Sequence, residues 1–155
     1  MKDLSLNNCD ELAYEEARKC AHRIIKAREK TSYELLKRLQ EKGHSLQASQ
    51  RVVTRFEEVG LVDDLRYREL YIRSAQYSNK GWRRIKSELK QRGIDTEYLE
   101  APPDEEELAR AKMVIGRLNL ETQKDKDRAL RRLQNKGFSY GIAKRAISDI
   151  LCHCV

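Results

Sequence analysis

The residues of this sequence that could do chemistry are few and scattered. Asp63 and Asp64 are adjacent acids that could hold a metal or act as a general acid, but two acids at a helix start more often cap its free amides. No carboxylate cluster, nucleophile–base pair or phosphate-binding glycine loop accompanies them in the sequence. The histidines stand far apart, at His22, His44 and His153. We therefore predict no catalytic residues and no enzymatic activity.

The cysteines do not form a metal-binding motif. They are Cys9, Cys20, Cys152 and Cys154, and none belongs to a CxxC pair. Cys152, His153 and Cys154 place three candidate ligands side by side, but no second cluster has the spacing that would complete a tetrahedral zinc site. We expect reduced, incidental thiols, with no metal and no cofactor.

Two stretches concentrate positive charge. Residues 80–86 hold four cations and the only tryptophan, and residues 124–145 hold eight basic side chains against two acidic ones. Such stretches could contact phosphates, because neutralising phosphates releases condensed counterions, or they could form a solvated helix surface. We favour a binding surface for these stretches as a whole. For Trp82, stacking on a base and packing at a helix start both remain open, and packing is favoured.

The composition limits the class of protein. Of 155 residues, 39% are hydrophobic, 6% aromatic and 37% charged, with a formal net charge of +7. A chain of this kind supports several thin cores rather than one thick one. No run approaches the ~18 apolar residues of a membrane span, and the first residues do not resemble a signal peptide. We expect a cytoplasmic protein.

The elements that must position these residues are set by an internal repeat. Three glycines, Gly43, Gly93 and Gly137, stand 50 and 44 residues apart. Each follows a leucine by four residues and a basic residue by one, and precedes a capping residue by two. In chain order these triplets are Leu39, Lys42 and Ser45, then Leu89, Arg92 and Asp95, then Leu133, Lys136 and Ser139. The pattern predicts a helix, a left-handed glycine and a capped second helix, with Ile94 and Phe138 packing back onto the turn.

A further helix precedes each repeat, at about residues 11–29, 63–78 and 104–119. The sequence therefore predicts an all-α fold of tandem three-helix repeats. The expected parts are an N-terminal tail (1–10), module 1 (11–60), module 2 (61–101), a Pro/acidic hinge (102–107) and module 3 with a short tail (108–155). In module 2 a short third helix should begin at Asp95 and run about two turns, because Pro102 and Pro103 stop it.

The central module resembles the RecX family of recombinase regulators. The matching segments are residues 60–67 (GLVDDLRY), 71–74 (YIRS) and 80–94 (KGWRRIKSELKQRGI). Residues 27–35 match in the first module, and residues 131–133 and 136–139 in the third, so the resemblance covers nearly all of 12–151. The sequence departs from the family at Pro102 and Pro103, where members more often continue a helix.

The resemblance implies an elongated, curved, basic array that binds the RecA–single-stranded DNA filament. Members restrain its ATPase, strand-exchange and coprotease functions in DNA repair and the SOS response. The expected partners are RecA and single-stranded DNA, the latter bound weakly and without sequence preference, by a monomer that does not bind membranes. Rival interpretations are a helix-turn-helix-like DNA-binding protein and a helical scaffold that binds only proteins. The predicted contact residues are Lys80, Trp82, Arg83, Arg84, Lys86, Arg92, Arg128, Arg131, Arg132 and Lys136.

Overall fold

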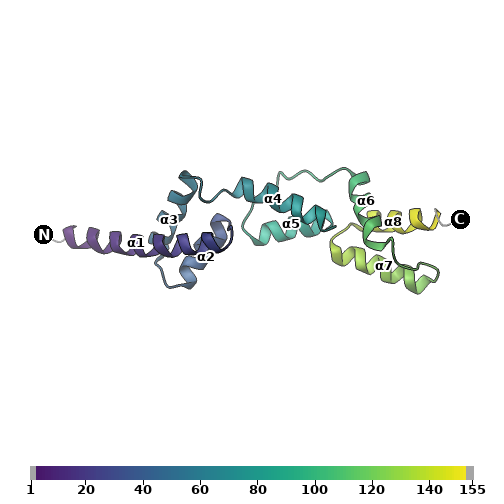
Figure 1. Cartoon of the computed structure of the whole chain (residues 1–155), viewed down its shortest axis with the longest axis horizontal. Coiled ribbons are helices and arrows are strands. Elements are labelled where there is room, and N and C mark those ends of the chain that lie inside the picture. Colours follow the sequence, from purple (N-terminus) through teal and green to yellow (C-terminus); the bar gives the residue numbers. More distant parts are fainter. Residues whose placement is uncertain (1–2, 153–155) are drawn as a thin grey trace. The chain divides into compact units, whose positions relative to one another are not determined.

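The structure is a computed structural model that describes residues 3–152, with side chains from residue 9 onward. Within that range every regular element is a helix (Figure 1), which confirms the predicted all-α class. The helices are α1 (Asp3–Ala27), α2 (Ser32–Glu41), α3 (Leu46–Glu58), α4 (Asp64–Tyr77), α5 (Trp82–Gln91), α6 (Asp104–Ile115), α7 (Gln123–Lys136) and α8 (Tyr140–Cys152). None of the described helices is long and apolar enough to cross a membrane.

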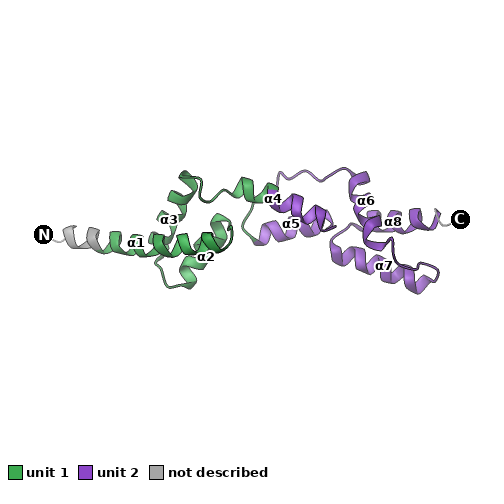
Figure 2. Ribbon diagram, viewed as in Figure 1, with its two compact units in different colours: residues 1–69, 92–94 green, residues 70–91, 95–155 purple. Residues whose placement is uncertain are grey.

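The chain forms two compact units (Figure 2), and their boundary falls within α4. Unit 1 holds residues 1–69 and 92–94, and unit 2 holds residues 70–91 and 95–155. The core of unit 1 comes from α1, α2 and α3, with Leu35, Leu39 and Phe56 among its fully or almost fully buried side chains. The division into three modules, with the boundaries given above, stays a prediction.

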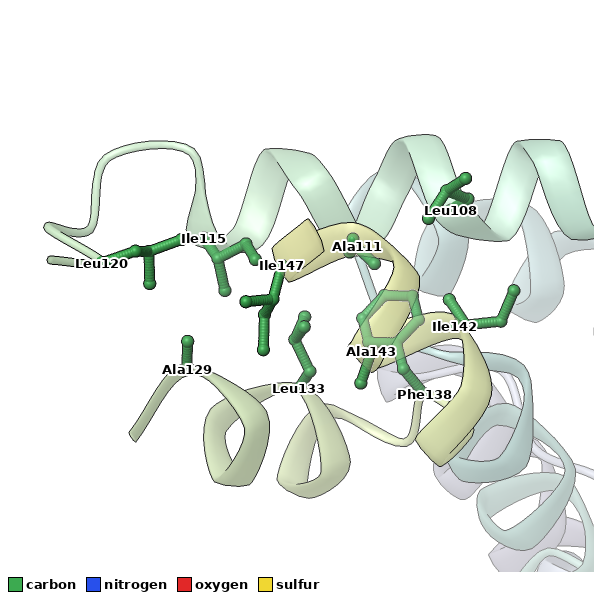
Figure 3. Packing of buried hydrophobic residues seen from close by; sticks show 11 residues of the cluster. Leu108, Ala111, Ile115, Leu120, Ala129, Leu133, Phe138, Ile142, Ala143 and Ile147 are labelled. Atoms are coloured by element: carbon green, nitrogen blue, oxygen red, sulfur yellow. The ribbon is translucent and has the colours of Figure 1, made fainter. Parts of the chain in front are cut away.

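The main core of unit 2 joins α6, α7 and α8. Figure 3 shows Leu133 of α7 and Phe138 pointing toward Ile147 and Ala111, between the three helices. Leu133, Ala111 and Ile147 each lie on the buried stripe of a helix, and Phe138 packs against them from the turn between α7 and α8. Burial of a narrow apolar face therefore orients each helix. The opposite face of α7 is left to its basic residues.

The repeated turns form as predicted at the glycines. Gly43, Gly93 and Gly137 all have left-handed backbone, with φ of 89°, 77° and 94°. The leucines four residues earlier are fully buried, and Ile94 and Phe138 are buried as well. Ser45 and Ser139 each accept a hydrogen bond from an amide of the next helix, both at 3.2 Å.

The predicted third helix of module 2 is wrong, because residues 92–103 contain no helix. The carboxylate of Asp95 accepts the amide of Glu97 at 2.8 Å, which closes a turn instead of capping a helix. Pro102 and Pro103 disfavour helical backbone in the residues before them, so too few positions remain for a stable helix to nucleate.

Other helix bounds differ less from the prediction. α1 begins at Asp3 rather than residue 11, and α6 ends at Ile115 rather than 119. α6 starts at Asp104 as predicted, so the acids of residues 104–107 form its first turn, where they face the positive end of the helix dipole.

Candidate nucleic-acid interface

A basic hollow lies on the surface of unit 2, between α5 and α7. Five of the predicted contact residues line it, together with one asparagine, and no carboxylate does. Its volume is ≈ 480 Å³ and it opens widely to solvent. The lining residues of this α5–α7 hollow are Arg84, Arg128, Arg131, Arg132, Asn135 and Lys136. The hollow thus brings together cations from two of the three modules that the sequence predicts.

The sequence of α7 places most of these cations on one face. Arg128, Arg131, Arg132, Asn135 and Lys136 fall at helical steps of three and four, so they share a side of the helix. The other side is held in the core by Ala129 and Leu133, both fully buried. Thr122 and Asp125 form a capping box at the start of the helix, and Gly137 ends it. Within residues 3–152, Arg128, Arg131 and Arg132 form no ion pair, so their charges are available to a partner.

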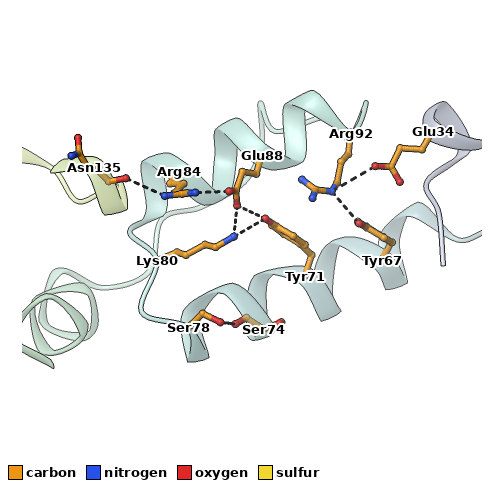
Figure 4. A network of polar contacts seen from close by, with 10 residues as sticks. All are labelled: Glu34, Tyr67, Tyr71, Ser74, Ser78, Lys80, Arg84, Glu88, Arg92 and Asn135. Atoms are coloured by element: carbon orange, nitrogen blue, oxygen red, sulfur yellow. Dashed lines mark hydrogen bonds and ion pairs between the residues drawn. The ribbon is translucent and has the colours of Figure 1, made fainter. Parts of the chain in front are cut away.

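Arg84 of α5 is held in place by a network of polar contacts (Figure 4). Its Nε donates to the Glu88 carboxylate at 3.0 Å, and its Nη1 donates to the backbone oxygen of Asn135 at 3.2 Å. Glu88 also accepts hydrogen bonds from Lys80 Nζ, at 2.7 Å, and from the hydroxyl of Tyr71. One carboxylate therefore positions one lining cation and neutralises a second cation nearby.

The electrostatics of this network favour the charged forms. Partial burial acts to raise the pKa of Glu88, but hydrogen bonds from Lys80, Tyr71 and Arg84 outweigh it and lower the pKa to about 2. Burial acts to lower the pKa of Lys80, but its hydrogen bonds to Glu88 and Tyr71 raise it. Glu88 thus stays ionised and Lys80 protonated at neutral pH.

The start of α5 is joined to the end of α7 through the backbone. The amide of Gly81 donates to the carbonyl of Lys136 at 2.9 Å, and the amide of Arg83 donates to the carbonyl of Gly137 at 3.2 Å. A Cβ on Gly81 would overlap the backbone of Gly137, so glycine permits this close approach. Free amides of one helix thereby meet free carbonyls of another, and the hollow forms beside this junction.

Glu107 completes the junction and was missed by the sequence analysis. It lies on α6, its residue is 7% exposed, and its Oε1 accepts the amide of Trp82 at 2.7 Å. The signal in the sequence was four consecutive acids at a helix start, which does not distinguish the one that turns inward.

The remaining predicted contact residues lie outside the α5–α7 hollow. Trp82 is 9% exposed. This burial favours packing at the helix start over stacking on a base. Lys80 is bound to Glu88, and Arg92, in unit 1, donates to the Tyr67 hydroxyl at 3.1 Å and lies 3.7 Å from Glu34. Arg83 is exposed and Lys86 half-buried, and neither lines the hollow.

The residues considered for catalysis have structural contacts instead. Asp63 caps α4 by accepting the amide of Arg66 at 2.9 Å. Asp64 accepts the amide and the hydroxyl of Ser32, at 2.8 and 2.6 Å. Cys9, Cys20 and Cys152 are free thiols, and no group within residues 3–152 offers three His, Cys, Asp or Glu ligands to a metal. His153 and Cys154 lie outside the described residues.

These features define the class of the protein: an all-α chain built from short capped helices, with a carboxylate-free basic hollow on its surface. The family model for "RecX, second three-helix domain" matches residues 63–101. The chain is 30% identical to the Regulatory protein RecX of Vibrio campbellii (strain ATCC BAA-1116), over 85% of this chain and 90% of that protein. It therefore belongs to the RecX family, as the resemblance predicted. Membership places it among regulatory proteins rather than enzymes.

Three further matches cover part of a relative or show the fold alone. The chain is 37% identical to the Regulatory protein RecX of Mycobacterium sp. (strain JLS), but over 55% of this chain and 47% of that protein, so the match spans about half of that relative. The crystal structure of RecX from Lactobacillus salivarius has a TM-score of 0.75 at 20% identity, covering 89% of this chain and 96% of that one. A second crystal structure of regulatory protein RecX has a TM-score of 0.77 at 19% identity, covering 96% and 78%. These two matches show the fold.

Proposed function

We propose that this protein regulates the RecA recombinase, mainly as an inhibitor, by binding the RecA–single-stranded DNA filament in the cytoplasm. In this proposal the α5–α7 hollow holds phosphates of the DNA backbone. The observation that supports it most is the lining of the hollow, which has five basic side chains and no carboxylate. Arginine presents a planar fork of donors that matches phosphate geometry, and three of the lining arginines form no ion pair within the described part of the chain.

The proposal assigns different roles to the predicted contact residues. Arg128, Arg131, Arg132 and Lys136 act directly, because they lie on the exposed side of α7 and line the hollow. Arg84 contributes from α5 and is oriented by Glu88. Trp82, Lys80 and Arg92 support the helices, since each is buried or bound to other side chains of the protein.

The test is RecA ATP hydrolysis on single-stranded DNA, measured while this protein is titrated and then repeated with excess DNA. We expect inhibition below one molecule per RecA protomer that added DNA does not relieve. Inhibition that disappears with excess DNA would reduce the protein to a DNA competitor and overturn the proposal. Strong selection of one duplex sequence would instead favour the helix-turn-helix-like alternative, and no DNA affinity at low salt would favour a protein-binding scaffold.

A matched pair of variants tests the hollow itself. Arg128→Glu with Arg131→Glu should abolish inhibition, because it reverses two charges that line the hollow. Lys144→Glu with Arg145→Glu makes the same charge change at exposed positions of α8 that do not line it, and should inhibit as the parent does. Equal inhibition by both variants would show that another surface is used.

A further inference from the structure

A second basic hollow lies on unit 1, and no predicted contact residue belongs to it. It has a volume of ≈ 420 Å³ and is open to solvent. Its lining comes from α1 and from the turn that follows α2: Glu16, Lys19, Cys20, Arg23, Lys42 and His44. We call it the α1–α2 hollow. Cys20 belongs to the core of unit 1 and is 7% exposed. A ligand in the hollow would therefore contact the polar side chains around Cys20.

The charges of the α1–α2 hollow are unbalanced. Lys19, Arg23 and Lys42 are exposed, and among the described residues none of them forms an ion pair or a side-chain hydrogen bond. Glu16 is the one carboxylate of the lining. Lys19 and Arg23 are one helical turn apart, so both point to the same side of α1. They lie in the interior of a helix that ends at Ala27, where compensation of the helix dipole does not account for them.

The internal repeat singles out Lys42 as well. Lys42, Arg92 and Lys136 are the basic residues that precede the three repeated glycines. Arg92 is bound by Tyr67 and lies beside Glu34, whereas Lys136 lines the α5–α7 hollow and Lys42 lines the α1–α2 hollow. A Cβ on Gly43 would also meet nothing within 4 Å, so the turn beside Lys42 is uncovered. In each unit, one basic residue of the repeat therefore lines a hollow: Lys42 in unit 1 and Lys136 in unit 2.

We propose that the α1–α2 hollow is a second binding site for the phosphates of a nucleic-acid backbone. The inference rests on the proposed function, which makes single-stranded DNA a partner. Three accessible cations against one carboxylate fit a polyanion, and both lysine and arginine donate hydrogen bonds to phosphate oxygens. Each unit then makes its own contacts with the DNA, and each set of contacts contributes to the free energy of binding.

The salt dependence of DNA binding counts these contacts. Binding of a labelled single-stranded oligonucleotide, long enough to reach both hollows, to the full chain is measured by fluorescence anisotropy over a range of salt concentrations. The slope of log K against log salt is negative, and each lost phosphate contact reduces its magnitude by about 0.7 for a single strand. We expect Lys19→Gln with Arg23→Gln to reduce the magnitude of the slope by about 1.4, for two lost contacts. Arg28→Gln with Lys37→Gln, a matched control at exposed positions outside the lining, should leave the slope unchanged.

Each outcome separates this inference from the proposed function. An unchanged slope in the Lys19 and Arg23 variant overturns the inference, while a slope of smaller magnitude for Arg128→Gln with Arg131→Gln in the same assay still supports the α5–α7 hollow. If the slope changes in the Lys19 and Arg23 variant but not in the Arg128 and Arg131 variant, the inference is supported and the α5–α7 hollow is removed from the proposed function. A Lys19 and Arg23 variant that binds DNA as the parent does but no longer inhibits RecA would mean that this hollow contacts protein, which overturns the phosphate site.

Discussion

At the scale of single residues, the three repeated glycines have different surroundings although they share left-handed backbone. A Cβ added to Gly43 would lie in open space. One added to Gly93 would overlap the side chain of Tyr33, and one added to Gly137 would overlap Arg84, including its backbone nitrogen at 2.6 Å. Gly43 is therefore required for its conformation, whereas Gly93 and Gly137 are required for both conformation and close approach.

Asparagine substitutions separate these two requirements, because asparagine tolerates left-handed backbone but carries a Cβ. We expect Gly43→Asn to change the free energy of unfolding by less than about 1 kcal/mol, and Gly137→Asn to lower it by about 1–3 kcal/mol through overpacking. Gly93→Val should also lower the melting temperature, since a β-branched residue resists this φ and meets Tyr33. Urea unfolding of the three variants gives the comparison. Equal losses at Gly43 and Gly137 would contradict the close approach of α5 and α7.

Glu88 makes stability depend on pH. Its pKa is about 2 in the folded chain against an ordinary value of 4.5. Between these values the unfolded chain binds a proton that the folded chain does not, so the stability contributed by Glu88 is complete above about pH 5 and is lost as the pH falls toward 2. Glu88→Gln removes this contribution. Urea midpoints of parent and variant should therefore differ at neutral pH and converge below pH 4, and a constant difference across that range would contradict the role of Glu88.

At the scale of elements, the sequence predicted the helix ends, because local interactions determine them. Helix ends at Gly43, Gly93 and Gly137 follow from residues within a few positions of each glycine, so their pattern is visible in the chain. The junction of α5 with α7 depends on Gly81 and Gly137, which are far apart in sequence, and no local pattern indicates that they meet. The cations of the α5–α7 hollow could therefore be named individually, but their grouping could not be predicted.

The prediction of a short third helix in module 2 was wrong because the local pattern at Asp95 did not take the rest of the segment into account. A capping residue two positions after a glycine led to a helix at Ser45 and Ser139, but at Asp95 the same pattern led to a turn. The difference lies in the length of chain that follows, because Pro102 and Pro103 leave about seven residues, fewer than an isolated helix needs. Capping residues indicate where a helix could begin, and the following residues decide whether it forms.

The cap that Glu107 provides for α5 can be tested by removing and restoring its acceptor. Glu107→Ala leaves the buried amide of Trp82 without a partner, and an unsatisfied buried group costs about 1–3 kcal/mol. We expect a loss of that size in urea unfolding, and a smaller loss for Glu107→Gln, whose side-chain oxygen can still accept the hydrogen bond. Glu105→Ala, an exposed position in the same turn of α6, is the control. If the Glu105 and Glu107 variants lose the same stability, the hydrogen bond to Trp82 does not matter.

At the scale of the whole molecule, the count of 32 lysines and arginines overstates the positive charge that any one partner could contact. Many cations are bound to acids of the protein itself, as Arg66 is to Glu29 and Arg38 to Glu41. The lining of both the α5–α7 hollow and the α1–α2 hollow, one in each unit, includes cations that form no ion pair within the described part of the chain. Two weak sites on one chain increase affinity for a single strand when both are occupied at once, because the second contact forms within the same complex.

This argument predicts how affinity depends on the length of the DNA. A short oligonucleotide occupies one hollow, whereas a longer strand reaches both, so the affinity of the parent should rise by on the order of 10² once the strand spans them. Lys19→Gln with Arg23→Gln, and Arg128→Gln with Arg131→Gln, should each remove that rise and leave the affinity for the shortest strands within a few-fold of the parent. Anisotropy titrations with a series of unstructured strands, at one salt concentration, measure it. A rise of the same size in the parent and both variants would mean that the two hollows do not share a strand.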